Sequence, residues 1–101
     1  MNRAAHTIAV VDDHDLARYA AVKMLRALGY RTVESATGEE AQLIAGSQKI
    51  SAMLLDVNLP DVNGVKVCEY LKKAPHPMPV VLMSAVYVDE LDKVWLTDFG
   101  G

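Results

Sequence analysis

The chain has 101 residues, of which 51% are hydrophobic and 23% are charged, and its formal net charge is -3 at pH 7. This length suits one domain, and the scattered Lys and Arg residues form no basic run, so this segment is not expected to bind nucleic acid directly. The apolar runs are too short to span a bilayer, the N-terminus lacks a secretory signal, and the single cysteine, Cys68, excludes an internal disulfide. We therefore expect a cytoplasmic domain without membrane association.

Four short apolar runs predict β-strands, in chain order IAVV (8–11), YRTVES (30–35), AMLL (52–55) and VVLM (80–83). Three of these runs are apolar without alternation, which is typical of strands in a parallel sheet that is covered on both faces. The run at 30–35 is more polar, so we place it at an edge of the sheet.

Helical patterns follow each strand, and the helices are predicted at about residues 16–28, 37–45, 63–74 and 91–99. The first has one wide apolar stripe and should end at Gly29. The second begins with the capping box TGEE (37–40), and Asn63 is expected to cap the third. The fourth is predicted from the spacing of apolar residues between Leu91 and Phe99. Alternation of strands and helices predicts an α/β fold with a parallel sheet between helical layers.

Three carboxylates and a hydroxyl are predicted to meet at one edge of this sheet. Asp12 and Asp13 follow the first strand, Asp56 follows the third, and Ser84 and Ala85 follow the fourth. Ligands bind beyond the carboxyl ends of parallel strands, where the strand order reverses. Three like charges destabilise one another unless a cation or a proton neutralises them, and oxygen ligands suit Mg²⁺. A metal ion beside a free carboxylate suggests phosphoryl transfer to Asp56.

These residues lie in the motifs VVDDHD (10–15), LLDVNLPDVNG (54–64) and VVLMSA (80–85). In this order and spacing, the chain resembles the receiver domain of two-component response regulators from about residue 8 to residue 101. The resemblance implies a flavodoxin-like, doubly wound parallel sheet with strand order 2-1-3-4. It also implies a signalling domain that is not an enzyme and that occupies residues 1–101.

The resemblance also implies roles for the acidic residues. Asp56 would accept a phosphoryl group from a phosphohistidine on a sensor histidine kinase or a histidine phosphotransfer protein, and so switch an output. Asp13, Asp56 and the backbone carbonyl of Asn58 would bind Mg²⁺ directly. Asp12 would act largely through a bound water.

Two residues of the fourth strand are assigned in the same way. Ser84 would hydrogen-bond the phosphoryl group and report its arrival, and Ala85 would leave access to it. The family pattern continues into a fifth strand, which carries a Lys that pairs with the phosphoryl group, and then a fifth helix. This sequence stops at DFGG (98–101), so we expect both elements to be missing. The chain is interpreted as a fragment of a longer protein or, alternatively, as a natural short form.

A missing fifth strand would leave the fourth as an unpaired edge, and we therefore expect self-association through the fourth strand and helix.

Two functions other than phosphoryl acceptance are considered. Haloacid-dehalogenase-like phosphatases carry a D-x-D motif, but here Asn58 replaces their general acid. A phosphorylation-independent domain that works by dimerisation or interaction remains the alternative. His14 could be read as a metal ligand, although a solvent-facing loop position is favoured.

Overall fold

The computed structural model describes residues 2–73, 77–88 and 91–98, and over 84–88 and 91–98 it describes the backbone. Its elements, in chain order, are a short 3₁₀ helix η1 (Arg3–Ala5), β1 (Thr7–Val11), α1 (Asp15–Ala27), β2 (Arg31–Ser35), α2 (Gly38–Ser47), β3 (Ala52–Asp56), α3 (Gly64–Lys72), β4 (Val80–Val88) and β5 (Leu91–Asp98).

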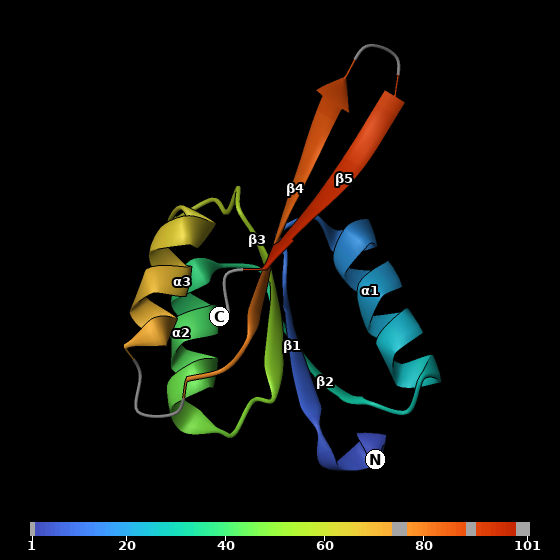
Figure 1. The fold of residues 1–101 in the computed structure, drawn as a ribbon, viewed down its shortest axis with the longest axis vertical. Helices are drawn as coiled ribbons and strands as arrows, with labels where there is room; N and C mark the ends of the chain where they lie inside the picture. Colours follow the sequence, from blue (N-terminus) through green and yellow to red (C-terminus); the bar gives the residue numbers. More distant parts are fainter. Residues whose placement is uncertain (1, 74–76, 89–90, 99–101) are drawn as a thin grey trace.

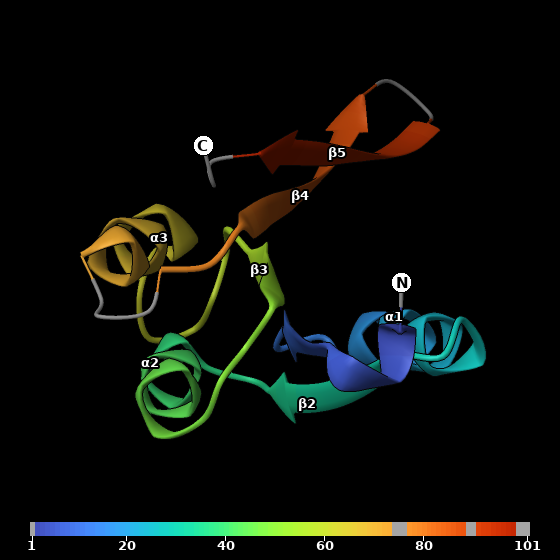
Figure 2. The same cartoon turned by 60° about the horizontal axis from the view of Figure 1, so that its bottom comes forward.

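The sheet has five strands in the order β2-β1-β3-β4-β5, and the pairings among the first four are parallel. This confirms the predicted order 2-1-3-4 and the edge position of the polar strand β2. The helix α1 lies on one face of the sheet, while α2 and α3 lie together on the other (Figures 1 and 2). The arrangement is therefore the doubly wound α/β fold that the alternation of elements predicts.

The main hydrophobic core lies between the sheet and the helices α2 and α3. It is formed by Ala9, Val11, Ala41, Ala45, Ile50, Met53, Leu55, Val67, Cys68, Leu71, Met78, Val80 and Leu82. On β1, β3 and β4 the core residues are two positions apart, as the alternation of side chains along a strand requires: Ala9 and Val11, Met53 and Leu55, and Val80 and Leu82. Cys68 is part of this core, and its thiol is free and buried.

The wide apolar stripe predicted for α1 is buried only in part. This helix packs against β1 and β2, and Val22 is its buried apolar residue. Leu16 and Met24 lie on the outward part of the stripe and are 75% and 59% exposed. A helix that packs on a sheet buries only the side chains that face the sheet. The part of the apolar stripe that extends beyond this buried face is therefore exposed.

Local signals place the ends of three helices as predicted. The Thr37 hydroxyl accepts a hydrogen bond from the Glu40 N–H (3.1 Å), and the Asn63 side chain accepts one from the Val65 N–H (2.7 Å). At the end of α1, Gly29 has a φ of 98°, a conformation that favours glycine. The Tyr30 N–H then donates to the Leu25 carbonyl (3.1 Å), which makes this end a Schellman motif.

The fourth helix predicted at 91–99 is wrong, because residues Leu91–Asp98 form the strand β5, antiparallel to β4. The register pairs Ser84 with Trp95 and Val88 with Leu91. The sequence LDKVWLTD contains the β-branched and aromatic residues that favour strands, and pairing satisfies the backbone groups along the edge of β4. An apolar spacing of three and four residues was compatible with a helix but did not exclude this hairpin.

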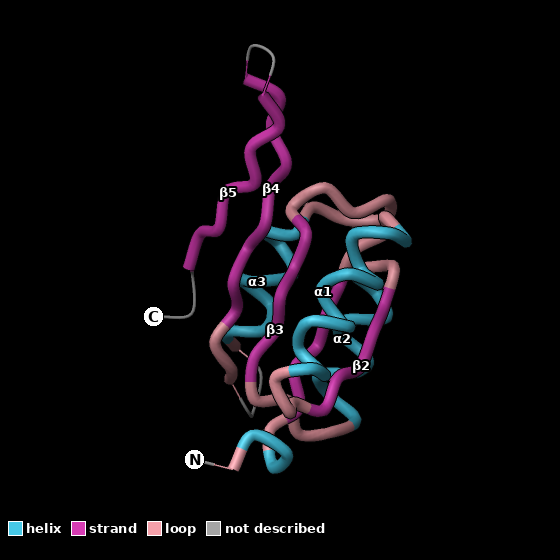
Figure 3. The backbone as a smooth tube through the Cα atoms, turned by 90° about the vertical axis from the view of Figure 1, so that its right-hand side faces the viewer, coloured by secondary structure: helices cyan, strands magenta, loops and turns pink. Residues whose placement is uncertain are grey.

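The hairpin also corrects the prediction that β4 is an unpaired edge. Its second strand, β5, is antiparallel to β4 and is formed by the residues predicted as the fourth helix, so it is not the fifth strand of the family pattern. The strand β4 extends from Val80 to Val88, well beyond the predicted 80–83, and β5 runs beside it (Figure 3). The premise for self-association through the fourth strand and helix therefore fails, although self-association itself stays a prediction. Phe99, the last residue of the predicted helix, lies outside the described residues.

Candidate functional site

The site lies at the carboxyl end of the parallel strands, where β1 and β3 deliver three aspartates. The pairing of β1 with β3 ends at Val11 and Leu55, and the next residue on each strand is Asp12 or Asp56. One carboxylate oxygen from each of Asp12, Asp13 and Asp56 lies within 4.8 Å of the others. The predicted convergence of these three side chains is thus confirmed, and Asp12 is only 8% exposed.

Two of the carboxylates also organise the turns that carry them. Asp12 Oδ1 accepts a hydrogen bond from the His14 N–H (2.9 Å), and Asp56 Oδ1 accepts one from the Asn58 N–H (3.0 Å). Each bond closes a short turn from residue i to residue i+2, a local geometry for which Asp is well suited. One oxygen of each of these two carboxylates also belongs to the cluster.

The electrostatics of the cluster disfavour a full set of negative charges. Burial raises the pKa of Asp56 above its usual value, and the neighbouring carboxylates of Asp12 and Asp13 raise it further. The hydrogen bond from the Asn58 N–H opposes this shift by stabilising the charged form. A cation bound among these carboxylates would remove the repulsion, and oxygen donors are the ligands that Mg²⁺ requires. The donor set therefore fits Mg²⁺.

Backbone and side-chain hydrogen bonds hold the loop that follows β3. The Gly64 N–H donates to the Val57 carbonyl (2.8 Å), and Asn58 forms an isolated bridge with Asn63. The Asp61 carboxylate accepts hydrogen bonds from the N–H groups of Gly38 and Glu39 (2.9 Å each) at the start of α2. These contacts fix the path of the loop that begins at the cluster.

The fourth strand reaches the same edge. Met83 pairs with Asp56, and the Val57 N–H donates to the Met83 carbonyl (2.9 Å), so the backbone of Ser84 comes next beside the cluster. The side chains of Ser84 and Ala85 lie outside the described side chains. The same holds for Lys93, which is on β5 opposite Val86 rather than on a helix.

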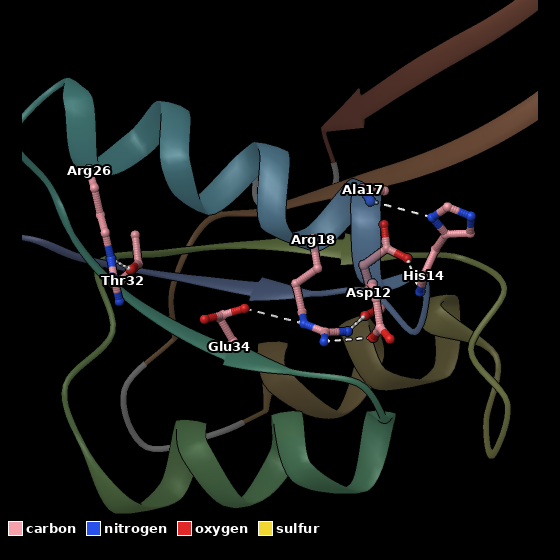
Figure 4. A network of polar contacts seen from close by, with 8 residues as sticks. Asp12, His14, Ala17, Arg18, Arg26, Thr32 and Glu34 are labelled. Atoms are coloured by element: carbon pink, nitrogen blue, oxygen red, sulfur yellow. Dashed lines mark hydrogen bonds and ion pairs between the residues drawn. The ribbon is translucent and has the colours of Figure 1, made fainter.

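Two residues near the cluster have contacts that sequence reasoning did not foresee. His14 caps α1, since its Nδ1 accepts a hydrogen bond from the Ala17 N–H (3.3 Å). The favoured solvent-facing position agrees with its exposure, but the capping role was missed. Arg18 donates to the backbone carbonyl of Asp12 (2.7 Å), as Figure 4 shows. The His14 cap is local, but His is not among the residues that usually cap a helix. The Arg18 contact has no sequence signal, because it depends on how α1 meets the end of β1.

Comparison with known proteins identifies the family. The model of the response regulator receiver domain matches residues 8–100. The chain belongs to this family. A probable transcriptional regulator, ycf27 of Cyanidium caldarium, is 32% identical over 99 residues, which are 98% of this chain and 39% of that protein. The alkaline phosphatase synthesis transcriptional regulatory protein PhoP of Bacillus subtilis is 32% identical over 93 residues, which are 92% of this chain and 38% of that protein.

A solved structure shows the same fold. The response regulator TrrA from Thermotoga maritima, in complex with Mg²⁺ and BeF, has a TM-score of 0.74 and 26% identity, with 78% of this chain and 69% of that chain covered. The parallel strand order 2-1-3-4 matches the flavodoxin-like receiver fold. This chain spans less than half the length of the two curated relatives. Within its described residues, no helix has the length and apolar character needed to cross a membrane.

Receiver domains are signalling domains of two-component systems, and they interact with sensor histidine kinases or phosphotransfer proteins. They bind Mg²⁺ at an acidic pocket. In this chain, the cluster of Asp12, Asp13 and Asp56 occupies the edge of the sheet at which such a pocket lies.

Proposed function

We propose that this domain accepts a phosphoryl group on Asp56, in the presence of Mg²⁺, from the phosphohistidine of a sensor histidine kinase or a histidine phosphotransfer protein. The observation that carries the proposal is the position of Asp56 at the end of β3, within 4.8 Å of the Asp12 and Asp13 carboxylates. A nucleophilic carboxylate beside two further acids is arranged to share a cation with the incoming phosphoryl group. The complex of TrrA with Mg²⁺ and BeF supports the choice of metal.

The chemistry assigned to Asp56 is a nucleophilic displacement at phosphorus. Asp56 Oδ1 already accepts a hydrogen bond from the Asn58 N–H, so Oδ2 is the oxygen proposed to attack. A P–O bond forms to the carboxylate, and the P–N bond of the phosphohistidine breaks, with its electron pair returning to the imidazole nitrogen. The product is an acyl phosphate on Asp56 and a free histidine on the donor.

The remaining residues are proposed to hold the metal and the phosphoryl group. Asp13, Asp56 and the backbone carbonyl of Asn58 would bind Mg²⁺ directly, and Asp12 would act largely through a water. When bound, Mg²⁺ supplies positive charge that neutralises the phosphoryl oxygens. Ser84 is proposed to hydrogen-bond the phosphoryl group, because its backbone follows the residue that pairs with Asp56. The small side chain of Ala85 would leave access to it.

We propose that residues 1–101 act as the receiver unit of this protein, in the cytoplasm, where a free buried thiol such as that of Cys68 is stable. Both curated relatives are named as transcriptional regulators, which favours control of transcription as the output. The cognate kinase is defined here by its chemistry, a phosphohistidine that donates to a carboxylate.

The test is intact-mass measurement of the full-length protein after incubation with acetyl phosphate and Mg²⁺. The expected result is the gain of one phosphoryl group, which Asp56→Asn abolishes and Asp61→Asn does not. Asp61 is the matched control because it lies in the same loop but is engaged at α2. A protein that gains no phosphoryl group, yet dimerises equally with and without acetyl phosphate, would instead be the phosphorylation-independent interaction domain.

A further inference from the structure

Arg18 links three elements at the edge of the acidic cluster. Its Nη1 donates to the Asp12 carbonyl (2.7 Å) at the end of β1, and its Nη2 contacts Asp15 Oδ1 (2.8 Å) at the start of α1. Its Nε contacts Glu34 Oε1 (3.3 Å) on β2. Figure 4 shows the guanidinium between Asp12 and Glu34. The Arg18 side chain is 19% exposed, whereas those of Asp15 and Glu34 are 88% and 43% exposed, so the two ion pairs are on the solvent side.

The Asp12 carbonyl belongs to the peptide bond that joins Asp12 to Asp13. Because this peptide is planar, its orientation constrains ψ of Asp12 and φ of Asp13 together, and so constrains how both residues are presented to the cluster. The pairing of β1 with β2 ends at Val11 and Ser35, and the Asp12 N–H continues the ladder to the Ser35 carbonyl (3.1 Å). The Asp12 carbonyl points instead to Arg18. This bond therefore sets the peptide plane at the point where the chain leaves the sheet.

We propose that Arg18 is a positioning residue, which sets the affinity of the acidic cluster for Mg²⁺ by holding the Asp12–Asp13 peptide. The inference rests on the function proposed above. A residue that orients metal-binding groups without touching the metal typically changes metal affinity by about 10- to 100-fold when it is replaced.

The positive charge of Arg18 would have the opposite effect on Mg²⁺ binding, so an electrostatic role and a positioning role can be distinguished by experiment. The pKa of Arg18 is raised, chiefly by its hydrogen bond to Asp15 and also by Glu34, so its charge is taken up by these two carboxylates. If charge alone mattered, removal of a cation near the site would strengthen Mg²⁺ binding. If Arg18 acts by positioning the Asp12–Asp13 peptide, its removal weakens Mg²⁺ binding.

The experiment is titration calorimetry of Mg²⁺ into the full-length protein and into its variants at one ionic strength. Arg18→Ala should raise the Mg²⁺ dissociation constant by about tenfold. Arg26→Ala is the matched control, because Arg26 also joins α1 to β2, through Thr32 Oγ1 (2.7 Å), but at the far end of the helix. It should change the dissociation constant by less than about twofold, since surface contacts far from a site act independently of it.

A second substitution keeps the test decisive if Arg18→Ala fails to fold. Arg18→Gln retains the stem of the side chain but is too short to carry a donor to the Asp12 carbonyl, and it should weaken Mg²⁺ binding in the same way. Unchanged or tighter binding in a folded Arg18 variant would overturn the positioning role while the proposed function stands. An absence of Mg²⁺ binding in the unsubstituted protein would refute the proposed metal site and the role of Arg18 with it.

Discussion

Gly64 lies against the backbone of Asp56 so closely that a Cβ at position 64 would overlap the Asp56 carbonyl oxygen and lie 2.9 Å from the Cα of Val57. The first residue of α3 is thus packed on the residue proposed to carry the phosphoryl group. The requirement for glycine here comes from this close approach rather than from a left-handed conformation.

Gly64→Ala should therefore destabilise the fold and displace Asp56. The expected loss is about 1–3 kcal/mol, the range for a side chain forced into a packed site, because the neighbouring atoms belong to the backbone of Asp56 and Val57 and cannot move independently of the chain. The measurement is urea denaturation. Gly46→Ala in α2 is the control, since a Cβ there meets nothing within 4 Å, and it should stabilise the protein by up to about 1 kcal/mol. Equal stability of the two variants would show that the Asp56 backbone yields without cost.

The raised pKa of Asp56 predicts how the metal-free protein responds to pH. Because the pKa is higher in the folded state than in the unfolded state, the favourable contribution of Asp56 is fully present below the unfolded pKa and is lost as the pH rises through the folded pKa. Asp56→Asn should consequently be more stable than the unsubstituted protein at pH 7 in a chelator. Melting temperatures of the two proteins test this, and a less stable variant would contradict it.

Mg²⁺ should offset the repulsion among the Asp12, Asp13 and Asp56 carboxylates in the unsubstituted protein. A cation that binds the native state alone stabilises it by about 2.7 kcal/mol at a hundredfold excess over its dissociation constant. Asp13→Asn should stabilise the metal-free protein and reduce the gain in melting temperature on addition of Mg²⁺. If the melting temperature of the unsubstituted protein were insensitive to millimolar Mg²⁺, the acidic cluster would not be a metal site.

Asp61 predicts a pH dependence of the opposite sign. The N–H groups of Gly38 and Glu39 stabilise its carboxylate and lower its pKa. A folded-state pKa below the unfolded value gives stability that is present above the unfolded pKa and lost as the pH falls through the folded pKa. Asp61→Ala should thus be less stable at pH 7, and the difference should shrink as the pH falls below 3.8. Urea midpoints across this pH range measure it, and a constant difference would point to packing instead.

Local and periodic features made much of the fold predictable. The helix caps Thr37 and Asn63 and the helix end at Gly29 depend on bonds within a few residues, so the sequence carries them completely. The meeting of Asp12 and Asp56 was predictable because the ends of neighbouring parallel strands lie at one edge of the sheet.

Contacts that depend on tertiary placement were not predictable. The hydrogen bond between Asp61 and Gly38 joins residues 23 apart in the chain, and the sequence around neither residue predicts this contact. The sequence predicts a helix where β5 lies, because an apolar spacing of three and four residues also occurs in a strand rich in Val, Trp and Thr. Pairing along β4 decided between the two, and pairing is a property of the assembled sheet.

The most direct test of the central claim, that Asp56 is the phosphoryl acceptor, is chemical localisation of the modified residue. Borohydride reduces the acyl phosphate of an aspartate to homoserine, so peptide mapping of the full-length protein after acetyl phosphate, Mg²⁺ and borohydride identifies the carboxylate that was modified. We predict homoserine at position 56, dependent on Mg²⁺. Homoserine at position 12, 13 or 61, with Asp56 unmodified, would contradict the assignment.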